Sequence, residues 1–488
     1  MTALLGIDIG TSASKGCLVA EYGRLISQEQ VPHQTSMPRP GWFEHDAQTI
    51  WLQDFGSLCR RLTAVGTAPA AVCISGIGPC LLPADSEGTP LRPAILYGID
   101  TRASAEIAEL TALLGDKEIL SRCGSPLTSQ AIGPKLRWLR NNEPGVWART
   151  RRFFMASSYL VHLLTGEYVL DHHSASQCDP LYDLGKRCWA EDWAIEIAPG
   201  LELPRLLWPG EVAGHVTAKA AALTGLQQGI PVLTGTIDAW AEAFSVGVSE
   251  PADLMLMYGT TMFLVQVVDR AVPDPRLWTT SGILPGTLTV AAGMATSGAL
   301  TSWFADLTGA SFEELLTEAD AVGPTSGLVI LPYFAGERTP LFDPAAKGVI
   351  AGLTLHHGRG HLYRALLEAT AYGVRHNLDV MAETSGPPSV VSAVGGGTRG
   401  GLWLQVVSDV CDIAQRIHEV TIGAAYGDAR LAAEGLGLGS VGWNPPVSTV
   451  QPDQEAHERY LPTYELYREL YPATKDIVHR LGASGSGT

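Results

Sequence analysis

Two segments of the sequence share one pattern, in which an apolar run, a Gly-Thr turn and a second apolar run follow one another. The first segment covers residues 4–19 and turns at Gly10, and the second covers residues 254–268 and turns at Gly259. The turns lie 249 positions apart (259 minus 10), about half of the 488 residues. Each segment predicts a β-hairpin, with a positive φ expected at Gly10. The chain therefore looks like two related halves.

The turn of the first hairpin carries the residue types of a phosphate site. Asp8 stands near the turn, and Thr11 and Ser12 offer hydroxyl and backbone N–H groups. Small residues let phosphate oxygens approach the backbone, and a carboxylate beside them can hold Mg²⁺. An ordinary polar turn explains the same residues. The second copy favours a nucleotide site, because two facing hairpins can hold one nucleotide, as in the actin-like ATPase fold.

The composition of the chain indicates how many cores it forms and which binding partners are excluded. A chain of 488 residues normally forms at least two cores, and 46% hydrophobic residues can fill them. The formal net charge of −17 argues against binding to nucleic acid or to anionic membranes, since both need a basic face. The eight cysteines show no metal-ligand spacing, and we expect reduced thiols. The N-terminus has no basic region ahead of an apolar core, which predicts no signal peptide and a cytoplasmic protein.

In the first half, a predicted strand over residues 71–74 ends in a glycine-rich bend that contains Gly78 and Pro79. Open α/β sheets usually place ligands at strand ends of this kind. Asp100 and Arg102 follow a further apolar run. They form either a solvated turn pair or part of a polar substrate pocket, because loops often carry function.

Asp238 falls at a predicted junction between a strand and a helix. It is either a helix N-cap or a general base that accepts the proton of a substrate hydroxyl during phosphoryl transfer. The two roles compete, because a carboxylate that caps backbone N–H groups is a weaker base.

In the second half, Gly395, Gly396 and Gly397 follow a predicted strand and precede a predicted helix. Bare backbone at such a place allows adenine or ribose to lie against it, although a lone triple glycine is a weak signal. The uncharged run over residues 283–305 predicts a strand that leads into a buried helix, since proline and polar residues interrupt it. Residues 482–488 predict a disordered tail.

Together these motifs resemble the FGGY carbohydrate kinases, and among them the xylulokinase-type enzymes. The most specific match is the pair of segments 348–353 and 361–368, which fits the C-terminal signature of that family. The other matching segments are residues 6–11 (first phosphate motif), 259–261 (second phosphate motif), 331–340 (a further family block) and 395–397 (adenosine motif).

The resemblance implies an α/β fold of two duplicated actin-like ATPase (ribonuclease H-like) domains with the active site in the cleft between them. Residues 1–246 would form the N-terminal domain, which binds the sugar and phosphate and ends with the catalytic aspartate. Residues 247–488 would form the ATP-binding domain, with a flexible tail from about residue 482. The implied reaction is phosphorylation of a small sugar or polyol by ATP with Mg²⁺. A homodimer is the candidate assembly, although the sequence does not set the oligomeric state.

The resemblance places the catalytic base on Asp238, and we assign Mg²⁺ to Asp8. The predicted contacts to ATP are Gly10, Thr11, Ser12, Lys15, Gly259, Thr260, Thr261, Gly395, Gly396 and Gly397. The predicted substrate pocket consists of Gly78, Pro79, Asp100, Arg102, Asp238 and Trp240. The indole of Trp240 either stacks on a sugar face or fills the core.

Three departures from the xylulokinase pattern leave the sugar open. The sugar-contacting loop usually contains Gly-Gln-Met-His-Gly, whereas residues 76–80 are Gly-Ile-Gly-Pro-Cys. Ala239 stands where Asn is usual, and Gln130 and Ile132 replace a small residue and a Thr. Lost hydroxyl-binding partners can change selectivity by orders of magnitude.

Two rival functions share this fold and these motifs. In an actin-like phosphatase or ATPase, water would replace the sugar. A nucleotide- and sugar-sensing protein would bind without catalysis. The presence of both Asp8 and Asp238 favours the kinase.

Overall fold

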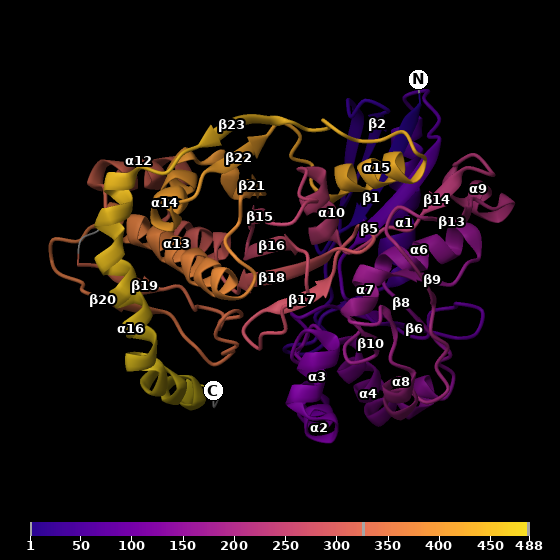
Figure 1. Ribbon diagram of the computed structural model, residues 1–488, viewed down its shortest axis with the longest axis horizontal. Helices are drawn as coiled ribbons and strands as arrows, with labels where there is room; N and C mark the ends of the chain where they lie inside the picture. The colour runs from indigo at the N-terminus through magenta and orange to yellow at the C-terminus, as the bar shows by residue number, and fades with distance from the viewer. Residues whose placement is uncertain (1, 325–326, 486–488) are drawn as a thin grey trace. The chain divides into compact units, whose positions relative to one another are not determined.

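The computed structural model describes residues 2–324 and 327–485, and the chain divides into two compact α/β units (Figure 1). The first unit contains the chain up to residue 249 together with residues 268–289 and 422–445. The second contains residues 250–267, residues 290–421 and the chain from residue 446. Two later segments of the chain thus belong to the first unit, which a single division of the sequence near its middle does not anticipate.

The first unit is built on a six-stranded sheet with the strand order β13-β14-β5-β1-β2-β3. β1 pairs antiparallel with β2 and parallel with β5, and β14 adds a further parallel pairing to β5. All seven residues of β1 are buried. The strands are β1 (Ala3–Ile9), β2 (Ala13–Ala20), β3 (Leu25–Pro32), β5 (Ala71–Gly76), β13 (Val212–His215) and β14 (Pro231–Leu233).

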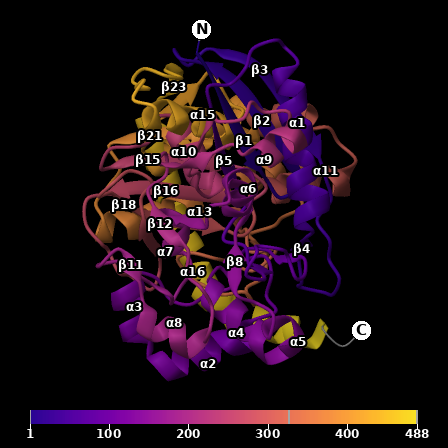
Figure 2. The same cartoon turned by 90° about the vertical axis from the view of Figure 1, so that its right-hand side faces the viewer.

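Helix α15 (Ala424–Gly435) packs closely on β1 and on α10 (Asp238–Ser245), as Figure 1 shows. Glycines make this approach possible. A Cβ atom on Gly6 would lie 1.9 Å from the carbonyl oxygen of Ala425, and one on Gly427 would lie 1.8 Å from that of Ala241. Helix α1 (Gln53–Thr63) lies beside β2 and β3 (Figure 2).

The first unit also contains shorter elements around this sheet. They are β4 (Glu44–His45), the π-helix η1 (Ala47–Leu52), β6 (Leu82–Ala84), β7 (Ala94–Ile95), α2 (Ser104–Leu114), α3 (Asp116–Cys123), α4 (Ile132–Asn142), α5 (Pro144–Trp147), β8 (Arg152–Phe154), α6 (Ala156–Thr165), β9 (Val169–Asp171), α7 (His172–Ser176), β10 (Tyr182–Asp183), β11 (Cys188–Trp189), α8 (Glu191–Ile197), β12 (Arg205–Leu207), α9 (Ala218–Thr224) and β17 (Trp278–Ser281).

Within the second unit, the strands of the main sheet follow the order β18-β16-β15-β21-β22-β23. β15 pairs antiparallel with β16 and parallel with β21, and β22 adds a further parallel pairing to β21. The strands of this unit are β15 (Asp253–Tyr258), β16 (Met262–Val268), β18 (Leu288–Met294), β19 (Val329–Leu331), β20 (Val349–Ala351), β21 (Val390–Val394), β22 (Gln415–His418) and β23 (Pro446–Val450). The pairing of β15 therefore repeats that of β1, which confirms the predicted duplication.

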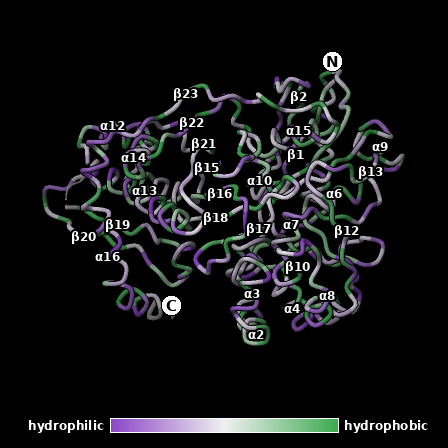
Figure 3. Tube along the Cα trace, in the orientation of Figure 1, coloured by the Kyte–Doolittle hydropathy of each residue, from purple (hydrophilic) through white to green (hydrophobic). Residues whose placement is uncertain are grey.

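The helices of the second unit pack mostly on one another, and α14 also contacts β23. Their hydropathy is mixed along the chain (Figure 3). They are α11 (Gly298–Thr308), α12 (Phe312–Val322), α13 (Arg359–Thr384), the 3₁₀ helix η2 (Gly396–Arg399), α14 (Gly401–Cys411) and α16 (Gln454–Gly485). None of the helices in the described ranges is long and apolar enough to cross a membrane. The uncharged run over residues 283–305 forms β18 and most of α11, which confirms the predicted strand and helix. The helix is not buried as a whole, because Ser302 and Trp303 are exposed.

The tail expected to be disordered divides in two. Residues 482–485 belong to the last turn of α16, whereas residues 486–488 lie outside the described residues.

Candidate active site

The hairpin β1–β2 carries the first predicted phosphate turn. The backbone N–H of Gly10 donates to the carbonyl oxygen of Ala13 at 3.2 Å, which closes the turn. The expectation of a positive φ at Gly10 is wrong, since this residue is not among the glycines with a left-handed backbone. Glycine is needed here for space, because a Cβ atom would lie 2.7 Å from the carbonyl oxygen of Ala13.

Asp8 lies near the end of β1 and is buried. Burial raises the pKa of its carboxyl group to about 6, while the charge of Lys15 and a hydrogen bond from Ser75 lower it. Among the described residues, Asp8 Oδ1 has no hydrogen-bond partner. A buried carboxylate oxygen without a partner is costly, so this atom is well suited to bind a ligand.

Asp238 is the first residue of α10, and the preceding Ile237 bridges to Gly76 at the end of β5. Its Oδ1 accepts a hydrogen bond from the backbone N–H of Ala239 at 2.7 Å. Ile237 occupies the N-cap position, so Asp238 is not the N-cap residue. Its carboxylate is committed to only one backbone N–H group, which leaves capacity for a substrate proton.

The pKa of Asp238 lies well above the usual value of a carboxyl group. Burial is the largest cause, and the negative charge of Asp8 raises the pKa further. The residue as a whole is half-buried. A perturbed carboxyl group beside a second one is typical of an acid–base site.

Sequence reasoning missed two further carboxylates beside Asp8. Burial raises the pKa of Glu242 to about 7, with Lys15 lowering it and Asp8 raising it. Asp428 of α15 is buried, and its Oδ2 accepts hydrogen bonds from the backbone N–H and the hydroxyl of Ser75 at 3.0 and 2.6 Å. Spacing could have indicated Glu242, because residues four positions apart share one helix face.

The bend at residues 76–80 lies against the residue that precedes Asp238. A Cβ atom on Gly78 would lie 2.6 Å from Cγ1 of Ile237. Pro79 and Cys80 are buried. The bend therefore offers backbone and apolar surface near Asp238 and few side-chain hydrogen-bond donors.

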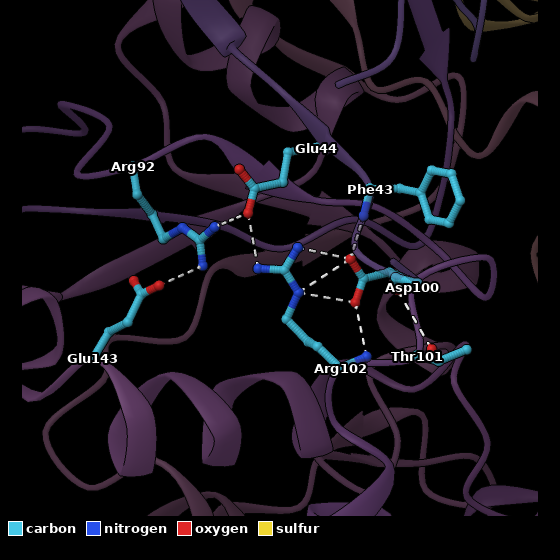
Figure 4. Close-up of polar contacts among 8 residues, drawn as sticks. Phe43, Glu44, Arg92, Asp100, Thr101, Arg102 and Glu143 are labelled. Atoms are coloured by element: carbon cyan, nitrogen blue, oxygen red, sulfur yellow. Dashed lines mark hydrogen bonds and ion pairs between the residues drawn. The ribbon is translucent and has the colours of Figure 1, made fainter. Parts of the chain in front are cut away.

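Arg102 and Asp100 form a buried pair, so the solvated alternative is wrong (Figure 4). Arg102 Nε and Nη2 donate to the two carboxylate oxygens of Asp100 at 2.9 and 2.8 Å, and Nη1 donates to Glu44 at 2.8 Å. The guanidinium group lies 4.2 Å from the ring centroid of Trp42 and 5.1 Å from that of Trp138. Most of its hydrogen-bonding capacity is thus used within the protein.

The same network continues through a second arginine. Arg92 donates to Glu44 and forms an ion pair with Glu143 at 3.2 Å (Figure 4). Asp100 also accepts a hydrogen bond from the backbone N–H of Phe43 at 2.7 Å. These contacts indicate a supporting network around residues 100–102.

Trp240 packs in the interior of the first unit. Its indole N–H donates to the hydroxyl of Thr289 at 2.9 Å, and its ring lies on that of His173 with centroids 4.0 Å apart. Only 5% of the residue is exposed. This packing favours the core alternative over a stacking surface for a sugar.

The second unit brings the other two glycine motifs together. The N–H of Gly259 donates to the carbonyl oxygen of Thr261 at 3.1 Å, and the carbonyl oxygen of Thr260 accepts from the backbone N–H groups of Ser297 and Ala299. A Cβ atom on Gly395 would lie 2.6 Å from the carbonyl oxygen of Tyr258. The glycine run 395–397 thus lies beside the second hairpin.

Each unit therefore assembles a part of the predicted site. The first unit brings together the turn at Gly10, Asp8, Lys15 and Asp238, and the second unit brings together the segments 259–261 and 395–397. Paired carboxylates and duplicated glycine turns on two α/β units define a phosphotransferase of the sugar-kinase type.

Comparison with known proteins identifies the family. Residues 3–245 match the N-terminal domain of the FGGY family of carbohydrate kinases, and residues 254–436 match its C-terminal domain. The chain belongs to this family. It is a carbohydrate kinase, a phosphotransferase with an alcohol group as acceptor and ATP as substrate.

Relatives of two kinds are similar along nearly the whole chain. A xylulose kinase of Lactococcus lactis is 29% identical and covers 99% of both chains. A glycerol kinase of Streptomyces avermitilis, glycerol kinase 2, is 30% identical over 92% of this chain and 94% of its own. The crystal structure of xylulose kinase from Rhodospirillum rubrum matches with a TM-score of 0.90 at 32% identity, covering 98% of this chain and 100% of that one.

Proposed function

We propose that this kinase transfers the γ-phosphoryl group of MgATP to a primary or terminal hydroxyl of a small sugar or polyol, with Asp238 as the general base. The observation that supports this most is that the charge of Asp8, beside the glycine turn, raises the pKa of the buried Asp238 carboxyl group. The acceptor oxygen forms a bond to the γ-phosphorus as the bond to the β–γ bridging oxygen breaks. ADP leaves, and the hydroxyl proton passes to Asp238.

Asp8 is the residue that we assign to Mg²⁺. Its buried Oδ1 lacks a partner among the described residues, and the negative charges of Asp238 and Glu242 act at the same place, so a divalent ion fits. The described residues contain no group of three His, Cys, Asp or Glu arranged to hold a metal. Mg²⁺ usually keeps waters and phosphate oxygens as ligands, so it needs only one or two protein carboxylates. When bound, the ion neutralises charge on the phosphates.

The two domains would divide the substrates between them. We assign the N-terminal domain (residues 1–246) to the acceptor and the phosphates, and the C-terminal domain (residues 247–488) to ATP. The residues proposed to contact the phosphates are Gly10, Thr11, Ser12, Lys15, Gly259, Thr260 and Thr261, and those proposed to seat the nucleoside are Gly395, Gly396 and Gly397.

The preferred acceptor is proposed to be a sugar or polyol other than xylulose. Its pocket would contain Gly78, Pro79, Asp100, Arg102, Asp238 and Trp240, of which Asp100, Arg102 and Trp240 already have protein partners. Ile237 fills the space beside Gly78, so the bend presents apolar surface where xylulokinases usually carry polar side chains. Xylulose and glycerol, the substrates named for the similar kinases, are both to be compared.

One experiment separates the kinase from its two rivals. ATP consumption is measured by ADP release, with and without a panel of pentuloses, hexuloses and polyols. The proposal expects acceptor-dependent release of ADP. Release without any acceptor would indicate an ATPase, and a ligand-induced thermal shift without turnover would indicate a sensor.

We further propose that the enzyme acts in the cytoplasm, which its eight free cysteines support. The homodimer considered from the sequence remains a proposal. Light scattering on the purified protein tests it.

A further inference from the structure

Three consecutive carbonyl groups of the first phosphate turn are held by one short segment of chain. The carbonyl oxygen of Gly10 lies 3.1 Å from Nε2 of His33, and that of Thr11 accepts from the hydroxyl of Thr35 at 2.7 Å. The carbonyl oxygen of Ser12 accepts from the backbone N–H of His33 at 2.9 Å. Residues 33–35, which follow β3, thus fix the direction of each carbonyl.

The fixed carbonyls determine where the N–H groups of the turn point. In a trans peptide plane the N–H points opposite to the C=O. The N–H groups of Thr11 and Ser12 must therefore face away from residues 33–35. Neither donates a hydrogen bond to any other residue in the described part of the chain. Successive N–H groups without partners form a concave site for an anion.

The partners of His33 define its protonation state. Nδ1 lies 2.7 Å from Asp54 Oδ2, which also accepts from the hydroxyl of Ser14 at 2.8 Å, and Nε2 faces the carbonyl oxygen of Gly10. A carboxylate and a carbonyl oxygen are both acceptors, so both ring nitrogens must donate. Asp54 Oδ2 already accepts from the Ser14 hydroxyl, so this oxygen is an acceptor and the shared proton belongs to Nδ1.

The neighbouring His45 of β4 differs from His33 in its protonation, because only one of its ring nitrogens donates. The hydroxyl of Thr35 donates to Thr11, so it accepts from Nε2 of His45 at 3.0 Å, while Nδ1 of His45 accepts from the indole N–H of Trp51 at 3.2 Å. His45 is therefore neutral, with its proton on Nε2. Burial lowers its pKa to about 4, and the charge of His33 lowers it further.

The groups around His33 are consistent with a charged ring. Asp54 of α1 forms the ion pair, and the charge of Asp8 of β1 also interacts with the imidazole. The ring of His45 meets that of His33 edge to face, with centroids 5.1 Å apart. Asp54 and Asp8 thus supply negative charge beside the ring, and the neutral His45 supplies none.

We infer that His33, as an imidazolium held by Asp54, and Thr35, supported by His45, are positioning residues for the triphosphate of the nucleotide. They orient the peptide planes of residues 10–12 so that the free N–H groups of Thr11 and Ser12 meet phosphate oxygens. They do not touch the nucleotide themselves. This inference rests on the proposed role of the turn in phosphate binding.

The first test uses the two hydroxyl variants of Thr35. Thr35→Val removes the hydrogen bond to Thr11 while keeping the shape of the side chain, and Thr35→Ser keeps the hydroxyl. Affinities for the β,γ-imido analogue of ATP and for adenosine are measured by calorimetry. We expect Thr35→Val to weaken binding of the analogue roughly 5–10-fold, the usual effect of one lost hydrogen bond, and to leave adenosine binding unchanged. Thr35→Ser should restore the affinity.

The control is Thr63→Val, because the Thr63 hydroxyl bonds only to carbonyl oxygens of its own helix α1. It should leave both affinities unchanged. Equal weakening of the analogue and adenosine in Thr35→Val would overturn the inference, since a general structural loss does not single out the triphosphate. An unchanged affinity for the analogue would overturn it as well.

A second measurement needs no nucleotide and so separates this inference from the proposed function. The ¹⁵N chemical shifts of the histidine rings at pH 7 report which nitrogens carry protons. We expect both nitrogens of His33 to be protonated and His45 to carry a proton on Nε2 alone. An unprotonated ring nitrogen in His33 would contradict the inferred role of His33, even if the protein bound ATP. If the chemical shifts are as expected but the protein does not bind ATP, only the proposed function is contradicted.

Discussion

Asp8 and Lys15 are partners across the β1–β2 hairpin, in the register that pairs Ile7 with Gly16 and Ile9 with Ser14. This pairing places the ammonium group of Lys15 among the carboxylates of the first unit. Burial raises the pKa of Asp8, Asp238 and Glu242, and the positive charge of Lys15 opposes this effect at each of them. Lys15 thus links the phosphate turn to the proposed base.

Replacing Lys15 should change the pH dependence of the reaction. Without the ammonium group the negative carboxylate forms are less stable, so in Lys15→Met the pKa of Asp238 should rise further. The base is active when unprotonated, and the acid limb of the profile of kcat/KM against pH should therefore move to higher pH. The KM for ATP should also rise. The exposed Lys219→Met serves as the control, and a profile identical to wild type in Lys15→Met would refute the link.

Removal of the Asp8 carboxylate should change the dependence of activity on Mg²⁺ more than the binding of the sugar or polyol acceptor. Asp8→Ala should lower turnover and raise the Mg²⁺ concentration needed for half-maximal activity, because the proposed role of Asp8 is to position the ion. The KM for the acceptor should change little. An Mg²⁺ titration that matches wild type and the exposed variant Asp116→Ala would remove Asp8 from the metal site.

Arg102 should contribute more to the stability of the folded protein than to the binding of the acceptor. Arg102→Met would leave the buried Asp100 carboxylate without its partner, which we expect to lower the free energy of unfolding by about 3–5 kcal/mol. Thermal denaturation measures this loss. Arg205→Met, which removes an exposed ion pair to Glu167, should cost little. A stable Arg102→Met protein with a strongly raised KM for the acceptor would instead make Arg102 a substrate contact.

The acceptor panel should rank xylulose no better than second. A polar group left unpaired in a buried site costs roughly 1–3 kcal/mol, so two or three lost contacts at residues 76–80 and 239 can lower kcat/KM by several orders of magnitude. Steady-state kinetics with each acceptor provides the ranking. Preference for xylulose over every other pentulose, hexulose and polyol would show that other residues supply the contacts.

Local patterns made much of the fold predictable from the sequence. The apolar runs around Gly10 and Gly259 predicted both hairpins, because glycine turns and buried strands are encoded within a few residues. The run of glycines between a predicted strand and a predicted helix likewise lies between β21 and α14. Family motifs then indicated the class of enzyme.

Contacts between distant parts of the chain were not predictable in the same way. The hydrogen bonds from Ser75 to Asp428 join residues 353 positions apart, so no short-range pattern in the sequence predicts them. The close approach of Gly78 to Ile237 likewise depends on tertiary packing. Ser75 and Asp428, which lie near Asp8 in space, therefore emerged only from the structure.

The most direct test of the proposed mechanism is the turnover of Asp238→Asn. Asparagine keeps the shape of the side chain but cannot accept the acceptor proton as a carboxylate does. We expect kcat to fall roughly 10²–10⁴-fold, while the protein stays folded and its affinity for ATP is unchanged. Near wild-type turnover in a folded Asp238→Asn protein would contradict the assignment of Asp238 as the base.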